Sequence, residues 1–153
     1  MYVLPMMTII DAAYFERALA SHQHIALDFD DCLFDGPYSR LLTDYMAAHP
    51  EKLFSIITNR PGSREQQTIA EAVGLLLRRG ISHDFKYAHI ILSPDSALCG
   101  DTVDIHFKGK AAARIGASIL LDDDIIHQEG VLLHQIEFLH LPCAESLSIH
   151  TGW

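Results

Sequence analysis

Short apolar runs alternate with segments of helical periodicity along most of this chain, and this order restricts the possible folds more than any other feature. The apolar runs cover residues 25–29, 54–58, 89–92, 119–121 and 136–141. The helical segments cover residues 8–21, 38–46, 63–80 and 108–115. Such alternation is typical of α/β proteins, in which helices cover both faces of a mostly parallel sheet. We therefore expect a doubly wound, Rossmann-like α/β fold with a mostly parallel five-stranded sheet.

Capping residues predict where the helices begin and end. Thr8 is placed to cap the first helix, with Asp11 in its first turn. Ser63 and Gln66 have the spacing of a capping box, and Gly80 stands where a helix commonly stops. Residues 94–106 are mostly polar and are predicted to form a loop.

The length of 153 residues suits one domain with a substantial core. We expect a single domain over residues 1–153, with an N-terminal helix at about 8–21 and a core at about 25–142. Only about 20 residues separate Leu33 from the second strand, which is room for one crossover helix. No large cap domain is therefore expected over the edge of the sheet.

Cysteine usage and hydropathy favour a cytoplasmic protein. The three cysteines are widely separated, and none forms a CxxC pair. No apolar run approaches the roughly 20 residues needed to cross a bilayer, and the N-terminal segment lacks the pattern of a signal peptide. We expect no membrane partner, and the sequence indicates no oligomeric state.

The acidic residues are concentrated rather than spread evenly. The formal net charge is −9, and six of the 20 acids lie in two clusters, at residues 28–31 and 122–124. Outside these clusters 14 acids face 11 bases, which is close to balance. This concentration is what a cation site requires, whereas the overall charge disfavours a nucleic-acid surface.

Polar side chains stand at the ends of three predicted strands. In open parallel sheets, ligands bind at the carboxyl ends of the strands, so these side chains should converge on one edge. A lysine near the start of the last predicted helix would join them. The candidate residues are Asp28, Asp30, Thr58, Asn59, Arg60, Lys108, Asp122 and Asp123.

The strand-end Asp-x-Asp predicts phosphoryl chemistry. Alternate residues of an extended segment face the same way, so Asp28 and Asp30 can act together. One carboxylate can attack phosphorus while the other carries the proton of the leaving group and then that of water. Crowded carboxylates favour a hard cation such as Mg²⁺, and Thr58 and a lysine can bind the phosphoryl oxygens.

The pattern resembles the haloacid dehalogenase-like (HAD) superfamily of phosphohydrolases. The resemblance spans residues 25–124 and rests on four motifs in order: an apolar strand into Asp-x-Asp, a strand ending in Ser or Thr, a lysine, and a strand ending in paired acids. It implies that Asp28 forms an aspartyl-phosphate and that Asp30 is the general acid/base. It also implies that Thr58 binds phosphate. Asp122 and Asp123 would hold Mg²⁺ with Asp28 and the backbone carbonyl of Asp30.

Two assignments around these motifs are less direct. Lys108-Gly109 is similar to the family's Lys-Gly at the start of this helix, so Lys108 is the preferred phosphate-binding lysine and Lys110 the alternative. Asn59 and Arg60 directly follow Thr58 on the same edge, so they are candidate substrate-binding residues with Thr58 and Lys108.

The sequence leaves three functions open. The first is a magnesium-dependent phosphomonoester hydrolase of the small capless type, acting on a phosphorylated small molecule or a macromolecular phosphate end. The second is a catalytically idle HAD-like binding or assembly module, since Asp31-Cys32 stands where the family usually has Gly-Thr or a similar pair. The third is a phosphatase acting on nucleotides or nucleic-acid ends. It is favoured by short resemblances at residues 58–61 and 100–102.

Overall fold

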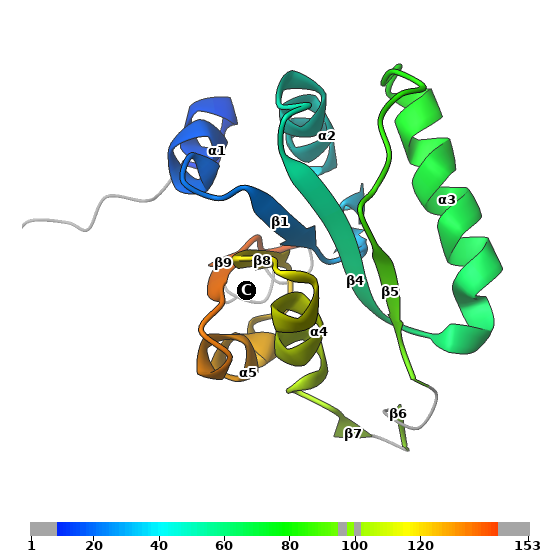
Figure 1. The fold of residues 1–153 in the computed structure, drawn as a ribbon, viewed down its shortest axis with the longest axis vertical. Coiled ribbons are helices and arrows are strands. Elements are labelled where there is room, and N and C mark those ends of the chain that lie inside the picture. The colour runs from blue at the N-terminus through cyan, green and yellow to red at the C-terminus, as the bar shows by residue number, and fades with distance from the viewer. Residues whose placement is uncertain (1–8, 95–97, 100–101, 144–153) are drawn as a thin grey trace, which may run out of the picture.

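The computed structural model describes residues 9–94, 98–99 and 102–143, and its centre is a five-stranded parallel sheet (Figure 1). The strand order is β5-β4-β1-β8-β9. The strands are β1 (His24–Leu27), β4 (Leu53–Pro61), β5 (Ile90–Ser93), β8 (Ile119–Asp122) and β9 (Glu137–His140). All neighbouring pairs in this sheet are parallel.

Helices cover both faces of the sheet (Figure 1). On one face lie α1 (Ala12–Leu19), α2 (Ser39–Ala48) and α3 (Glu65–Arg78), and on the other lie α4 (Phe107–Ile115) and α5 (Gln128–Leu133). Successive residues of β1 point to opposite faces, so Ile25 and Leu27 pack in the first core and Ala26 in the second. The structure therefore confirms the doubly wound α/β fold.

The strand order places β1 at the centre of the sheet, between β4 and β8. Leu27 of β1 is aligned with Ile56 of β4 and with Leu121 of β8. Because the three strands run in parallel, the segments that follow them leave the same edge of the sheet. The residues after Leu27, Thr58 and Leu121 are thus brought together by the fold itself.

The start of α1 differs from the prediction. Asp11, expected in the first turn, is instead the N-cap, and its Oδ1 accepts a hydrogen bond from the backbone N–H of Tyr14 at 2.8 Å. Thr8, the predicted cap, lies outside the described residues. The helix also ends at Leu19, two residues before the predicted end.

The capping box predicted for α3 is wrong. Ser63 lies in a 3₁₀ turn, η1 (Gly62–Arg64), and Arg64 is the N-cap without a side-chain capping bond. The chain tightens into a 3₁₀ turn before the helix, so Ser63 is one residue too early to cap it. At the other end Gly80 adopts a φ of 69°, which confirms it as the stop.

Two further segments differ from the prediction. Residues 94–106 contain an antiparallel pair, β6 (Leu98–Cys99) and β7 (Thr102–Val103), where a loop was predicted. Between β8 and β9 the chain forms η3 (Ile125–His127) and then α5, neither of which was predicted. α5 spans only six residues, too few to show a clear helical period in the sequence.

The segment after β1 is compact. It forms two short strands, β2 (Asp30–Cys32) and β3 (Phe34–Asp35), and a single helix, α2, then leads to β4. Asp31 and Asp35 adopt φ values of 59° and 62°. A Cβ on Gly36 would lie 2.6 Å from the carbonyl oxygen of Asp31, so only glycine fits this turn. No inserted cap domain lies between β1 and β4, all of whose connecting residues are described.

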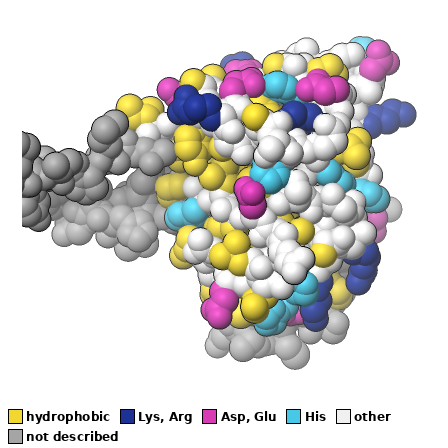
Figure 2. All heavy atoms as spheres, turned by 60° about the vertical axis from the view of Figure 1, so that its left-hand side comes forward, with side chains coloured by type: hydrophobic (Ala, Val, Ile, Leu, Met, Phe, Trp, Pro, Cys, Tyr) yellow, Lys and Arg dark blue, Asp and Glu magenta, His cyan; other side chains and the backbone are white. Residues whose placement is uncertain are grey.

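The described part of the chain contains no helix long and apolar enough to cross a membrane. On the face shown in Figure 2, basic, acidic and histidine side chains are interspersed. Among the described residues on this face there is no continuous basic track of the kind that follows a nucleic-acid backbone.

Candidate active site

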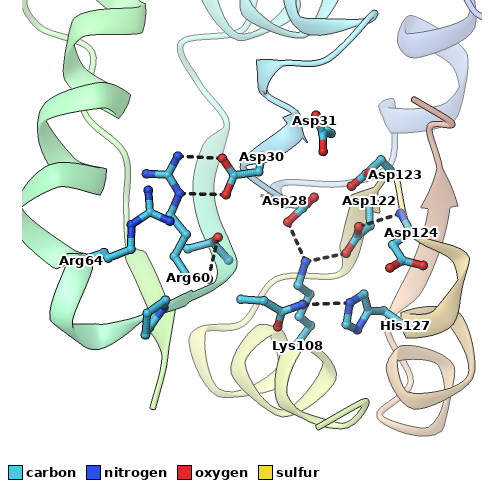
Figure 3. A pocket seen from close by; sticks show the side chains of 13 residues that line it. Asp28, Asp30, Asp31, Arg60, Arg64, Lys108, Asp122, Asp123, Asp124 and His127 are labelled. Atoms are coloured by element: carbon cyan, nitrogen blue, oxygen red, sulfur yellow. Dashed lines mark hydrogen bonds and ion pairs between the residues drawn. The ribbon is translucent and has the colours of Figure 1, made fainter. Parts of the chain in front are cut away.

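A polar pocket of about 350 Å³ opens at the carboxyl edge of the sheet (Figure 3). The ends of β1, β4 and β8 and the start of α4 form its walls. It is lined by Asp28, Asp30, Asp31, Thr58, Asn59, Arg60, Pro61, Arg64, Lys108, Asp122, Asp123, Asp124 and His127. All the candidate residues from the sequence therefore meet in one pocket.

Lys108 joins the ends of β1 and β8 inside this pocket. Its Nζ donates to Asp28 Oδ1 at 2.6 Å and to Asp122 Oδ2 at 2.7 Å. Lys108 is 1% exposed and Asp122 0%, so the ammonium bridges the two carboxylates away from bulk water. Lys110, the alternative, is exposed on α4 and does not line the pocket.

Glycine packing positions this lysine. A Cβ on Gly109 would lie 2.7 Å from the carbonyl oxygen of Gly130, so glycine lets α4 approach α5 closely. Lys108 and Gly109 are both buried at this start of α4. The Lys-Gly pair noted in the sequence thus has a packing reason.

Three carboxylates gather beside Lys108. One oxygen from each of Asp28, Asp122 and Asp123 can be chosen so that all lie within 4.8 Å of one another. Asp122 Oδ1 also accepts the backbone N–H of Asp124 at 3.0 Å, which fixes its orientation. Carboxylate oxygens at this spacing are the donors that Mg²⁺ prefers, so the residues fit that ion.

The pKa values indicate a surplus of negative charge. Burial raises the pKa of Asp28 well above its usual value, although the charge of Lys108 acts in the opposite direction. Burial likewise raises the pKa of Asp123 to about 6, helped by the charge of Asp122. For Lys108, burial acts to lower the pKa, but the charges of Asp28 and Asp122 outweigh it and raise it. One buried cation does not neutralise three carboxylates, and a divalent cation would.

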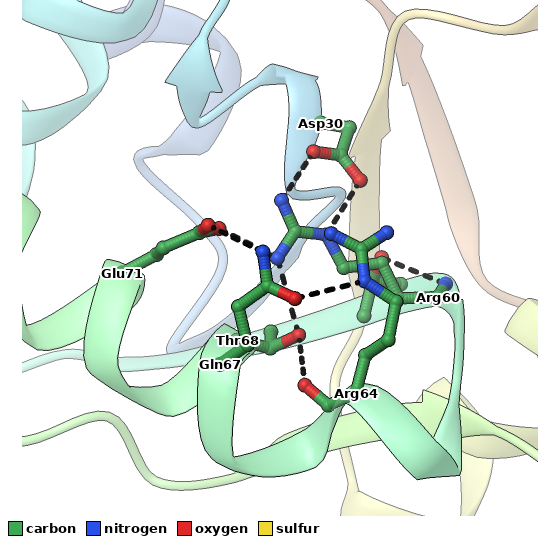
Figure 4. A network of polar contacts seen from close by, with 7 residues as sticks. Asp30, Arg60, Arg64, Gln67, Thr68 and Glu71 are labelled. Atoms are coloured by element: carbon green, nitrogen blue, oxygen red, sulfur yellow. Dashed lines mark hydrogen bonds and ion pairs between the residues drawn. The ribbon is translucent and has the colours of Figure 1, made fainter.

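Asp30 belongs to a second ion-pair network, on the β4 side of the pocket (Figures 3 and 4). Its two oxygens accept from Arg60 Nε at 2.8 Å and Arg60 Nη2 at 2.7 Å. Arg60 Nη1 donates to Glu71 at 2.6 Å and to Thr68 Oγ1 at 3.2 Å. The guanidinium carbon lies 4.8 Å from the ring centre of Phe29.

This network changes the expected roles of Arg60 and Asp30. Hydrogen bonds to Asp30 raise the pKa of Arg60, and the bond from Arg60 lowers the pKa of Glu71. Arg60, a predicted substrate-binding residue, instead donates its side-chain hydrogen bonds to other side chains of the protein. Asp30 turns toward Arg60, whereas Asp28 turns toward Lys108 (Figure 3). The two aspartates line one pocket but face different cations.

Thr58 and Asn59 line the pocket at the end of β4. Thr58 is buried, and its Oγ1 accepts the backbone N–H of Arg60 at 3.2 Å. Asn59 Nδ2 lies 3.0 Å from His127 Nε2. Burial lowers the pKa of His127, so the neutral ring can accept a hydrogen bond from the Asn59 amide. These contacts fix both side chains at the pocket wall.

Three residues of the site were missed from the sequence: His127, Arg64 and Glu71. His127 is the last residue of η3, whose N-cap Asp124 accepts the backbone N–H of Ile126 at 3.1 Å. An aspartate just before a helical turn is a usual start signal, so this turn had a sequence signal. The positions of Arg64 and Glu71 depend on where η1 ends and α3 begins, and the wrongly predicted capping box misplaced that boundary.

Cys32 has a packing role rather than a catalytic one. It is buried, and burial raises the pKa of its thiol well above the usual value, with the charges of Asp28 and Asp122 adding to the effect. A thiol in this environment stays protonated and is a poor nucleophile. Asp31 adopts a left-handed φ of 59°, and glycine takes this conformation most easily. A glycine would therefore fit the backbone at this position without strain.

No protein-family model and no curated protein sequence matches the chain. An uncharacterized protein from Corynebacterium glutamicum ATCC 13032 Kitasato has a similar structure, with a TM-score of 0.52 at 14% identity over 84% of this chain and 91% of that one. A universal stress protein solved in complex with cAMP has a TM-score of 0.52 at 12% identity, over 80% of this chain and 98% of its own. At such identities the similarity concerns the fold alone, and that fold is the doubly wound, Rossmann-like α/β sheet.

Proposed function

We propose that the protein is a magnesium-dependent phosphomonoester hydrolase that works through an aspartyl-phosphate on Asp28. The observation that carries the proposal is the buried Lys108 bridge between Asp28 and Asp122, with Asp123 beside them. Such a centre combines a carboxylate nucleophile, a cation for phosphoryl oxygens and a set of ligands for Mg²⁺. The resemblance to the HAD superfamily supports the same reading.

In the first half of the reaction, a carboxylate oxygen of Asp28 attacks phosphorus in line with the leaving oxygen. Lys108 holds Asp28 in place, and its ammonium with the Thr58 hydroxyl stabilises the charge on the phosphoryl oxygens. Mg²⁺, held by Asp28, Asp122, Asp123 and the backbone carbonyl of Asp30, would supply further neutralisation of that charge. The P–O bond to the leaving group breaks as the aspartyl-phosphate forms.

Asp30 serves both halves of the reaction. As an acid it gives a proton to the departing oxygen, and as a base it takes a proton from the water that attacks the aspartyl-phosphate. Inorganic phosphate and free Asp28 result. Because Asp30 is bonded to Arg60, it must exchange at least one of these bonds for the leaving group or the water.

The substrate is a phosphorylated small molecule or a macromolecular phosphate end, met in the cytoplasm. Between β1 and β4 the chain inserts a single helix and no domain that would cover the pocket from that side, so bulky leaving groups can enter there. Nucleotides and nucleic-acid ends remain within this class.

The test is phosphate release from an aryl phosphate, a nucleotide and a 5′-phosphorylated oligonucleotide, with Mg²⁺ or with a chelator. We expect Mg²⁺-dependent release that falls by ~10³-fold or more in Asp28→Asn. The matched control is Asp44→Asn, an exposed aspartate on α2, which should retain the wild-type rate. Release that survives in chelator and in Asp28→Asn would refute the mechanism. Repeating the oligonucleotide assay at two salt concentrations separates backbone binding from recognition of the phosphate alone.

A second candidate is a catalytically idle binding module. The observation that favours it is the engagement of both Asp30 oxygens by Arg60, which holds the proton carrier away from Asp28. Calorimetric binding of Mg²⁺ that needs Asp122, without turnover of any substrate in the panel, would support this candidate over the hydrolase.

A further inference from the structure

Arg64 lines the same pocket from the side opposite the Mg²⁺ ligands. It follows β4, in the turn that leads into α3, whereas the acidic clusters follow β1 and β8. Its Nε donates to Gln67 Oε1 at 3.2 Å, and Gln67 Nε2 donates in turn to Glu71 Oε1 at 3.1 Å. This chain of bonds orients the guanidinium and ties it to the Arg60 network (Figure 4).

Arg64 differs from the other two cations of the pocket in the partners of its hydrogen-bond donors. Lys108 bridges Asp28 and Asp122, and Arg60 bridges Asp30 and Glu71. Among the described residues, no ion pair or hydrogen bond engages the two terminal nitrogens of Arg64. Arg64 thus presents an oriented guanidinium edge with donors available to a ligand.

The two guanidinium groups lie next to one another in both close views (Figures 3 and 4). Like charges at close range repel unless anions lie between or beside them. Asp30 and Glu71 form ion pairs with Arg60, and the charge of Arg64 also helps to lower the pKa of Glu71, but no carboxylate in the described part of the chain forms an ion pair with the Arg64 edge. An anion supplied by a ligand would complete the arrangement.

We propose that Arg64 binds a second anionic group of the substrate, so that the preferred substrates are phosphate esters whose leaving group carries a carboxylate or a further phosphate. This inference rests on the proposed function, because it names the substrate class of the same pocket. The acids of β1 and β8 repel a second anion on their side, which leaves the β4 side as the place for it. A guanidinium fork suits either anion, since both present paired oxygens.

The distance between the phosphoryl group at Asp28 and the second anion at Arg64 follows from the spacing of strands in the sheet. Neighbouring strands lie about 4.8 Å apart, and Arg64 stands just beyond the strand next to β1. The second anion should therefore lie roughly 5–10 Å from the phosphorus, one to two strand spacings away. A meta-substituted phenyl phosphate spans such a distance.

The test compares phenyl phosphate derivatives that differ only in the meta group: a carboxylate, a phosphonate and, as the neutral counterpart, a carboxamide. In the wild type, kcat/KM for the two anionic compounds should exceed that for the carboxamide by about tenfold or more, since a charge-assisted bond contributes this much. Arg64→Gln should remove most of this preference, and 0.5 M salt should weaken it. Whether carboxylate or phosphonate is preferred identifies the natural anion. Arg17→Gln, at an exposed residue of α1 that does not line the pocket, is the control that should keep the preference.

A binding experiment separates this inference from the proposed function. The probe is a meta-carboxyphenyl phosphonate, which cannot be hydrolysed at the P–C bond, titrated with Mg²⁺ into wild type and Arg64→Gln by calorimetry. Weaker binding to Arg64→Gln, with no turnover of any ester, would refute the hydrolase and keep the anion subsite. Asp28-dependent turnover with an unchanged anion preference in Arg64→Gln would overturn the subsite alone.

Gln67→Ala, which releases Arg64 from its orienting bond, should reduce the preference in part, and an undiminished preference there would contradict the role of Gln67.

Discussion

Two cations in the pocket each bridge a pair of carboxylates, yet their surroundings differ. Lys108 joins Asp28 and Asp122, all three of them buried. Arg60 is also buried, but its partners Asp30 and Glu71 have side chains that are 49% and 27% exposed. We refer to these as the lysine bridge and the arginine bridge.

The difference in exposure concerns how the charge of each bridge is balanced. In the arginine bridge the carboxylates keep part of their hydration, so their charge is balanced by Arg60 and water together. The carboxylates of the lysine bridge are buried, so water does not hydrate them if the lysine charge is removed. Asp123 adds a third acid beside them. A buried surplus of charge is costly to maintain without a bound cation, so the lysine bridge is the part of the pocket suited to binding and chemistry.

The largest effect should come from Lys108→Met. It leaves two buried carboxylates without their cation, which should lower the free energy of unfolding by about 3–5 kcal/mol and abolish activity. Urea denaturation at neutral pH without metal measures the loss. Lys110→Met, on the exposed side of the same helix, is the control and should change stability by less than about 0.5 kcal/mol. A loss below about 1 kcal/mol for Lys108→Met would show that the bridge is not buried as described.

Arg60→Gln should have a smaller effect on stability. Its carboxylate partners can recover hydration, so we expect a loss of about 1–3 kcal/mol, including the contact with Phe29. The same urea experiment measures it, with Arg40→Gln on α2 as an exposed control. If Arg60→Gln destabilised the protein more than Lys108→Met, the contrast between the two bridges would be reversed.

The lysine bridge should also give Mg²⁺ binding a pH dependence. The pKa of Asp123 is raised from 3.8 to about 6 in the folded protein. Without metal, the native state therefore holds this proton more tightly than the unfolded chain, so the stabilising contribution of Asp123 is present at low pH and is lost as pH rises to about 6.

Mg²⁺ competes with that proton, so the increase in Tm caused by Mg²⁺ should be larger at pH 7.5 than at pH 5. Thermal melts with and without 5 mM Mg²⁺ at the two pH values measure the effect. Asp123→Asn should remove most of the difference. Equal Mg²⁺ shifts at both pH values in the wild type would argue against Asp123 as a ligand.

The smallest effect concerns Asp31, which directly follows Asp30 of the arginine bridge. At a φ of 59° a glycine is less strained than an aspartate, although it loses more entropy on folding. Asp31→Gly should therefore raise the free energy of unfolding by about 0.5 kcal/mol. Asp84→Gly, in an exposed loop without positive φ, is the control and should give no gain. A clear loss in Asp31→Gly would mean that the aspartate side chain stabilises this turn.

The sequence predicted the lysine bridge better than the arginine bridge, and the reason is topological. Asp28 and Asp122 directly end strands that are neighbours in the sheet, so a strand assignment brings them together. Lys108 was preferred to Lys110, which stayed open as the alternative, because a glycine follows Lys108, and this glycine allows the close packing of α4 on α5.

The arginine bridge depends on details that patterns of hydrophobicity do not contain. Glu71 meets Arg60 only because α3 begins at Glu65 after a 3₁₀ turn, which sets the side of the helix on which Glu71 lies. Asp30 likewise faces Arg60, and the left-handed φ of Asp31 directly after it interrupts regular strand alternation. Alternation alone predicted that Asp28 and Asp30 would act side by side, whereas they face different cations.

The central claim, that Asp28 is a phosphoryl acceptor, is tested most directly by trapping the acyl phosphate. Asp30→Asn slows attack of water on the intermediate, so this variant should accumulate it during turnover of an activated, ³²P-labelled aryl phosphate with Mg²⁺. After acid quench and proteolysis, we expect the label on the peptide that contains Asp28, in the alkali- and hydroxylamine-sensitive form of an acyl phosphate. Turnover without a labelled protein, or a label on any other residue, would contradict the account.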